Sequence, residues 1–137
     1  MKAEVFAEHI RNCIKQRGIN ALQTLIGEDT NPFKDECIPA SYLLYEVYKN
    51  MGMKLFRKRD YKNNYHWWNK IGETTIDITK EQYTLEGKPV PSDDYTDATK
   101  ERPMNFPSYW KRVEKLKVEM KEYIKANKLE KEFRDLF

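Results

Sequence analysis

The chain of 137 residues has the length of a single domain and is long enough to bury a hydrophobic core. Apolar residues make up 39% and charged residues 34%, a balance typical of globular rather than disordered proteins. No apolar run reaches the length of a membrane span, and the N-terminus lacks the apolar core of a signal peptide, so we expect a soluble, cytoplasmic protein with no membrane partner. The net charge of +3 is spread along the chain, which disfavours a nucleic-acid partner.

Helical periodicity dominates the first part of the chain. An apolar stripe over residues 5–14 predicts a helix, and Gly18 is placed to end it. Cys13 falls on this stripe, so we expect it to be a small buried hydrophobe. A second short helix is predicted over residues 22–26, closed by Gly27.

A further helix is predicted within residues 37–52, "CIPASYLLYEVYKNMG". Pro39 marks its start, because proline is tolerated only in the first turn of a helix, and Gly52 marks its end. Cys37 therefore lies at or just before the N-terminus of this helix. Without a secretion signal, Cys13 and Cys37 are both expected to be free thiols.

Alternation of apolar and polar residues then replaces the helical pattern. It predicts one strand in "KLFRKR", residues 54–59, and two more in "YHWWNKIGETTIDIT", residues 65–79. Four prolines within residues 84–108 indicate an ordered loop around short structure, and one long helix or two follow from Ser108. The sequence thus predicts a single α+β domain over residues 1–137, in which the cysteine-bearing helix packs on a small antiparallel sheet between N- and C-terminal helices.

The hairpin within residues 65–79 brings two polar side chains together. A turn centred on Ile71 and Gly72 places His66 opposite Asp77, and we expect a loop of four residues because Ile71 suits a positive φ poorly. Directly opposed Cβ atoms lie roughly 5 Å apart, which lets a carboxylate accept a proton from the imidazole.

This register also assigns the faces of the two strands, because alternate residues point to opposite sides. It pairs Trp67 with Ile76 and Trp68 with Thr75. Trp68 and Thr75, on the same face as the histidine, are candidates for substrate binding. The expected core face carries Tyr65, Trp67, Ile76 and Ile78, and the expected polar face carries His66, Trp68, Thr75 and Asp77.

A histidine held by an aspartate has a fixed tautomer and a stabilised imidazolium, and can act as a general base. The candidate nucleophile is Cys37, because the helix dipole, free backbone amides and a nearby imidazolium favour its thiolate. The same amides would stabilise an oxyanion. The alternative remains that His66 is an exposed strand residue and Asp77 an ordinary acid. Neither zinc nor another cofactor is expected, because no second Cys or His lies at ligand spacing.

These residues together resemble the YunG-like family of small proteins. The pattern of that family places Gly-Gln-Cys before a helix, His-(Tyr/Trp)-Trp-Asn on one strand, and Asp-(Leu/Ile)-Thr-x-x-Gln-(Phe/Tyr) at the exit of the next. The resemblance covers about residues 31–124, and the layout is also similar to a papain-like or NlpC-like core. The matching residues are Cys37, His66, Trp67, Trp68, Asn69, Asp77, Ile78, Thr79, Gln82 and Tyr83.

One position departs from the family pattern. The residue before the cysteine is Glu36 where the family has glutamine. A carboxylate there works against a Cys37 thiolate unless it points to solvent, and it cannot donate to an oxyanion. Asn31 is a candidate to supply a side-chain donor instead.

The predicted function is thiol-dependent hydrolysis or acyl transfer at an amide, isopeptide or thioester bond. Cys37 would be the nucleophile, His66 the general base and then acid, and Asp77 the residue that orients it; the substrate would be a protein, a peptide or a small acyl compound. A first alternative is a binding protein on a degenerate papain-like scaffold, such as a host-interaction or anti-defence factor. A second is nucleotide or single-stranded nucleic-acid binding through Trp68 and the run "FRKRDYK".

Overall fold

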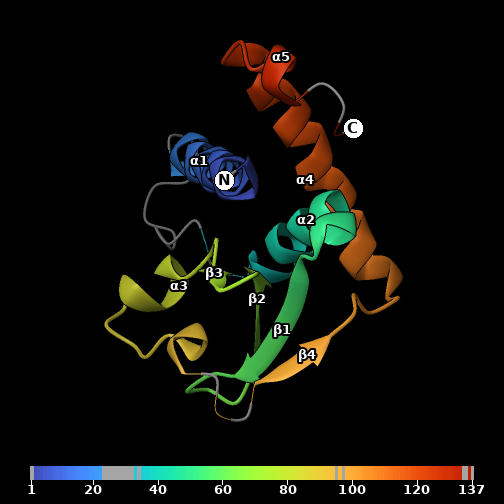
Figure 1. Ribbon diagram of the computed structural model, residues 1–137. Coiled ribbons are helices and arrows are strands. Elements are labelled where there is room, and N and C mark those ends of the chain that lie inside the picture. Colours follow the sequence, from blue (N-terminus) through green and yellow to red (C-terminus); the bar gives the residue numbers. More distant parts are fainter. Residues whose placement is uncertain are drawn as a thin grey trace.

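A four-stranded antiparallel sheet carries the candidate site in the computed structural model (Figure 1). The structure describes residues 2–22, 33, 35–94, 96, 98–133 and 136, and for residues 18–22 the backbone alone. The strands lie in the order β3-β2-β1-β4, and each neighbouring pair is antiparallel, as the alternating pattern predicts. Their bounds are β1 (Lys54–Arg59), β2 (Tyr65–Ile71), β3 (Thr74–Ile76) and β4 (Thr99–Glu101).

The helix α2 packs on the sheet. In Figure 1, α2 lies between the sheet and α4, and α1 lies beside α2 and α4. Within the described part of the chain, no helix is long and apolar enough to cross a membrane. The helices are α1 (Lys2–Leu22), α2 (Cys37–Tyr48), α3 (Glu81–Thr84), α4 (Pro107–Ala126) and α5 (Glu130–Phe133), with 3₁₀ turns η1 (Lys49–Met51) and η2 (Pro91–Asp93).

The N-terminal helix is longer than predicted. It runs to Leu22 and passes through Gly18, so the predicted end at Gly18 is wrong. Glycine inside a helix costs only about 1 kcal/mol relative to alanine, which the buried apolar stripe of α1 readily offsets. Residues 23–32, which include most of the predicted second helix and Gly27, lie outside the described residues.

The predicted start of the cysteine-bearing helix is confirmed, and the α-helix itself ends at Tyr48, before the predicted end at Gly52. Cys37 is the first residue of α2, Pro39 lies in its first turn, and Gly52 ends the following 3₁₀ turn with a φ of 90°. The strand predicted over residues 54–59 is β1, and the C-terminal segment forms two helices rather than one.

The predicted register of the hairpin is wrong by two residues. The loop holds only Gly72 and Glu73, and Asn69 rather than Trp67 pairs with Ile76. Gly72 has a φ of 56°, the pattern of a type II′ turn, so glycine takes the left-handed position and Ile71 stays in the strand. The predicted direct pairs Trp67–Ile76, Trp68–Thr75 and His66–Asp77 are therefore wrong, although an even shift leaves every side chain on its predicted face.

The core face packs on α2. The rings of Tyr42 and Trp67 meet edge to face with centroids 5.3 Å apart, and the Asn69 amide donates to the carbonyl of Ser41 at 3.0 Å. Trp67, Ile76 and Ile78 are buried as predicted, but Tyr65 is 42% exposed because it begins the strand.

The opposite face, which we expected to be a polar face, is also covered. His66 and Trp68 have no exposed surface. Residues 77–94 contact this face, through the ring of Tyr83 against His66 and through the carbonyl of Asp94, which accepts from Lys58 at 2.7 Å. The histidine is thus held inside the protein rather than presented on the sheet surface.

Candidate functional site

Cys37 opens α2 directly after a strained turn. Asp35, two residues earlier, has a φ of 63°, a left-handed conformation that aspartate tolerates better than most residues. Glu36 occupies the N-cap position but makes no side-chain hydrogen bond to the helix. The positive end of the helix dipole therefore acts on Cys37 without a carboxylate cap, and the thiol is 8% exposed.

His66 is bound to Asp77, as predicted, although the two residues are not directly opposite. Its Nε2 lies 2.8 Å from Oδ2 of Asp77. Asp77 follows the last residue of β3, and continuing the ladder would place it opposite Trp68, so His66 is its diagonal neighbour. Diagonal neighbours on one face remain within reach of long side chains. The contact was therefore predicted correctly from a wrong register.

Asp77 is held by two further groups. Its Oδ2 accepts a second hydrogen bond, from the hydroxyl of Ser92 at 2.6 Å, and its backbone carbonyl accepts from Arg11 at 3.2 Å. The carboxylate is buried, and its Oδ1 has no hydrogen-bond partner among the described residues. Donors on Oδ2 favour the ionised carboxylate, which in turn favours a charged His66.

The charge on the imidazole is set by opposing effects. Burial by itself lowers the pKa of His66, because the imidazolium loses its hydration. The charge and hydrogen bond of Asp77 outweigh burial, helped by a hydrogen bond and charge from Cys37, and raise the pKa of His66 to about 10. Because Asp77 occupies Nε2, the thiol can interact with the ring only at Nδ1, which the amide of Gln82 also approaches.

A single segment, residues 77–83, surrounds the ring. Tyr83 meets His66 edge to face at 4.9 Å, and its hydroxyl donates to Asp60 at 2.9 Å. The amide Nε2 of Gln82 lies 2.9 Å from Nδ1 of His66 and 3.3 Å from the hydroxyl of Thr79. An amide can donate through nitrogen to a neutral ring or, after rotation, accept through oxygen from an imidazolium, so Gln82 suits both states.

Glu36 does not point to solvent. It forms an ion pair with Arg17, which also binds both carboxylate oxygens of Glu119 at 2.7 and 2.8 Å. The guanidinium of Arg17 therefore offsets part of the negative charge expected to oppose a Cys37 thiolate, because Arg17 is shared between Glu36 and Glu119.

The predicted substrate-binding residues have different surroundings. Trp68 is fully buried and stacks between Phe56 and His66, with centroids 6.1 and 6.0 Å away, so it forms a wall of the histidine site. Thr75 is exposed and lines a cavity of about 520 Å³ together with Asp77. Asn31 lies outside the described residues.

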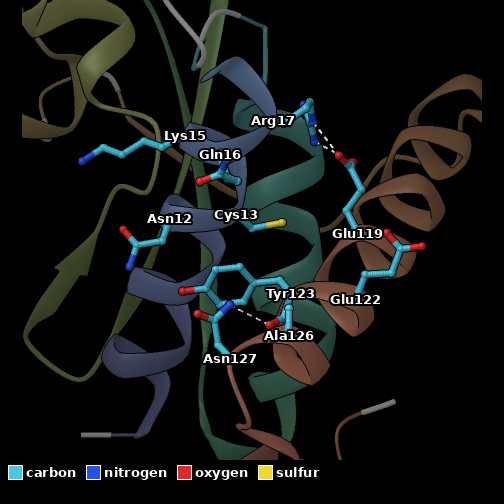
Figure 2. A pocket seen from close by; sticks show the side chains of 10 residues that line it. All are labelled: Asn12, Cys13, Lys15, Gln16, Arg17, Glu119, Glu122, Tyr123, Ala126 and Asn127. Carbon is cyan, nitrogen blue, oxygen red and sulfur yellow. Dashed lines mark hydrogen bonds and ion pairs between the residues drawn. The ribbon is translucent and has the colours of Figure 1, made fainter. Parts of the chain in front are cut away.

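A second cavity, of about 750 Å³, lies between α1 and α4 (Figure 2). Cys13 lines it, and burial together with the charge of Glu119 raises the pKa of this thiol to about 11. Neither of these two cavities is lined by Cys37 or His66.

The remaining histidine has a structural environment. Nδ1 of His9 lies 3.0 Å from the hydroxyl of Tyr123, so it links α1 to α4. Among the described residues, no group of three His, Cys, Asp or Glu side chains is arranged to hold a metal ion.

Comparison with known proteins identifies the family. The family model described as YunG protein matches residues 5–125. The chain belongs to the YunG family. The YunG match includes α1 and most of α4 as well as the Cys37, His66 and Asp77 positions, so it extends beyond the segment that the sequence motifs cover. No curated protein and no solved structure matches the chain.

Sequence reasoning missed several residues around the site. Gln82 and Tyr83 belong to the YunG pattern but were assigned no role, and their spacing from Asp77 was the available signal. Ser92 lies in the proline-rich segment, and Arg11 and Arg17 lie on a helix with no motif, so no local pattern connected them to His66 or Cys37.

Proposed function

We propose that Cys37, His66 and Asp77 carry out thiol-dependent acyl chemistry on an amide, isopeptide or thioester. The observation that carries the proposal is the buried His66, bonded to Asp77 through Nε2 and interacting with Cys37. A thiol at a helix N-terminus beside an imidazolium is the arrangement in which cysteine is most nucleophilic. A papain-like core, which the sequence resemblance implied, would use the three groups in these roles.

In the proposed reaction, the proton of the Cys37 thiol is held on Nδ1 of His66, which gives an imidazolium–thiolate pair, and the sulfur attacks the substrate carbonyl carbon. Backbone amides in the first turn of α2 would stabilise the resulting oxyanion. Collapse of the intermediate breaks the bond to the amine or thiol leaving group, which takes the proton from His66. Water or an acceptor amine then gives a proton to His66 and attacks the Cys37 thioester, which releases the acyl group and restores the thiol.

A second candidate, a non-catalytic binding protein on a degenerate scaffold, is favoured by one observation. His66 is fully buried and Cys37 is 8% exposed, so a substrate reaches the pair only if the covering residues move. A host-interaction or anti-defence role would need neither residue to be accessible.

Nucleic-acid binding stays disfavoured. Trp68 is buried and cannot stack on a base. Arg57 and Arg59 of the basic run both lie over the ring of Tyr65, at 4.2 and 4.3 Å, and Arg57 also pairs with Glu101. Absence of any salt-sensitive oligonucleotide binding at low ionic strength is the expected result.

The experiment that tests the acyl chemistry uses p-nitrophenyl acetate as a generic acyl donor. We expect a burst of p-nitrophenolate and an acetyl group on Cys37, located by peptide mass spectrometry. Cys13→Ser is the matched control and should keep the burst, whereas Cys37→Ser should lose it. An equal burst in both variants, or no acetylation of Cys37, would refute the proposed chemistry and favour the binding protein.

A further inference from the structure

We propose that Arg11 and Arg17 of α1 are positioning residues and that each of them holds one half of the candidate site. Arg17 holds the Cys37 half and Arg11 holds the half that carries His66 and Asp77. The inference rests on the site proposed above and assigns to α1 a role in its assembly.

The Cys37 half is tied to α1 through Arg17. This side chain, 28% exposed, pairs with Glu36, the residue directly before Cys37. It also binds both oxygens of Glu119 on α4, and Figure 2 shows the Arg17 and Glu119 side chains reaching across the gap between the two helices. Arg17 is thus fixed by α4 and in turn fixes the residue that begins α2.

The other half is tied to α1 through Arg11, whose side chain is 18% exposed. One guanidinium nitrogen donates to the backbone carbonyl of Asp77 at 3.2 Å, and another pairs with Glu81. Asp77 begins the segment that surrounds His66, residues 77–83, and Glu81 lies within it, directly before Gln82. Arg11 therefore holds this segment at its first residue and again just before Gln82.

The chemistry of each site calls for arginine. Each guanidinium serves two acceptors on different elements, which its planar fork allows and a lysine ammonium does not fix in the same way. Six residues separate Arg11 from Arg17, so at 3.6 residues per turn they leave α1 about 120° apart and roughly 9 Å along its axis. One rigid helix can therefore set the position of both halves relative to each other.

The two arginines act by different physical effects. Arg17 compensates the charge of Glu36, which would otherwise oppose the thiolate of Cys37 at the start of the helix. Arg11 fixes backbone position, because it holds the carbonyl of Asp77 rather than its carboxylate. The effects can be separated by experiment.

The first test measures the rate of iodoacetamide alkylation of Cys37 at pH 7. Arg17→Met should slow it about tenfold, and adding Glu36→Gln should restore it to within about twofold of wild type, because the opposing charge is gone. Lys15→Met, an exposed change on the same helix, is the control and should leave the rate unchanged. Failure of Glu36→Gln to restore the rate would overturn the Arg17 assignment.

The second test follows the ¹⁵N signals of the His66 ring against pH. Arg11→Met should lower the midpoint by about one pH unit and weaken the signature of the Asp77 hydrogen bond, and Glu36→Gln should not restore either. The double variant Arg17→Met/Glu36→Gln should give the wild-type His66 spectrum. An unchanged spectrum in Arg11→Met would overturn the Arg11 assignment.

Two outcomes separate this inference from the proposed function. If wild-type Cys37 is alkylated as slowly as Cys13, the proposed function and the Arg17 assignment both fail, while the Arg11 test still stands. If wild-type Cys37 is alkylated rapidly but the Arg11 and Arg17 variants do not show the separate effects expected of them, only the positioning role fails. If Arg17→Met does not fold, Arg17→Lys takes its place, because lysine keeps the positive charge but lacks the planar fork. Adding Glu36→Gln to Arg17→Lys must then raise the alkylation rate of Cys37.

Discussion

The two cysteines of this protein are almost equally buried and differ in what surrounds them. Cys13, 6% exposed, lies in the middle of α1 and faces Glu119 across the α1–α4 cavity. Cys37, 8% exposed, begins α2 and interacts with His66. Burial and an acidic neighbour raise the pKa of the first thiol to about 11, whereas the second contributes to the raised pKa of a histidine that Asp77 favours in its charged form.

The comparison teaches that burial alone does not decide the reactivity of a thiol. What decides it is the sign of the charge placed beside the sulfur and the position in the helix. Substitutions can remove, one at a time, the groups that distinguish Cys37 from Cys13.

The largest effect is expected from removing the imidazole. His66→Gln should lower the alkylation rate of Cys37 at pH 7 by about 100-fold, the usual contribution of a positioned general base, and so bring it near the rate of Cys13. Competitive labelling followed by peptide mass spectrometry measures both rates in one sample. His9→Gln is the control, because His9 contacts Tyr123 and not the site. An unchanged Cys37 rate in His66→Gln would show that the two cysteines differ for another reason.

Removing the carboxylate should act on the histidine itself. Asp77→Asn should leave the fold intact and lower the pH midpoint of the His66 titration by more than one unit, because the carboxylate favours the imidazolium. Asp77→Ala should behave similarly. Thr75→Ala, on the same face but exposed, should shift the midpoint far less. The ¹⁵N titration of the ring measures all three, and an identical curve for Asp77→Asn and wild type would falsify the pairing.

The raised pKa of His66 also predicts a dependence of stability on pH. The folded value near 10 lies above the ordinary 6.5, so the stabilisation is complete below pH 6.5 and is lost as pH rises toward 10. For one proton, the free energy of unfolding should fall by at most about 1.4 kcal/mol per pH unit. Urea unfolding between pH 6.5 and 8.5 tests this below the range in which Cys13 titrates. His66→Gln should flatten the slope, and an equally steep slope in that variant would contradict the assignment.

The smallest effect is expected from removing the Gln82 amide, the second hydrogen-bond partner of the His66 ring. Gln82→Met removes one hydrogen bond at Nδ1 without changing the charge, and a neutral hydrogen bond contributes about 0.5–1.5 kcal/mol. The alkylation rate of Cys37 should therefore fall about threefold to tenfold. Gln16→Met on α1 is the matched control and should have no effect. Equal rates for the two variants would remove Gln82 from the site.

Much of this arrangement follows from the sequence, because the relevant signals are local. Proline marks the start of α2, glycine ends the 3₁₀ turn that follows this helix, and strand alternation fixes the face of His66. The contact with Asp77 survived an error in register because a shift of two residues preserves the face and the side chains reach a diagonal neighbour.

Other features depend on packing between distant segments, which periodicity does not encode. The partner of Glu36 comes from α1, 19 residues earlier, and Ser92 reaches Asp77 from a loop with no regular pattern. The burial of His66 and Trp68 was missed for the same reason, because residues 77–94 return to cover a face whose alternation resembles that of a solvated strand.

The most direct test of the account is the ratio of the two alkylation rates in the wild-type protein at pH 6. Iodoacetamide labelling of each cysteine over time, read by peptide mass spectrometry, gives both rates from the same molecules. Because His66 is charged at this pH, whereas the charge of Glu119 outweighs that of Arg17 beside Cys13, Cys37 should react at least about tenfold faster. Equal and slow labelling of Cys13 and Cys37 would contradict the assignment of Cys37 as a nucleophile activated by His66 and Asp77.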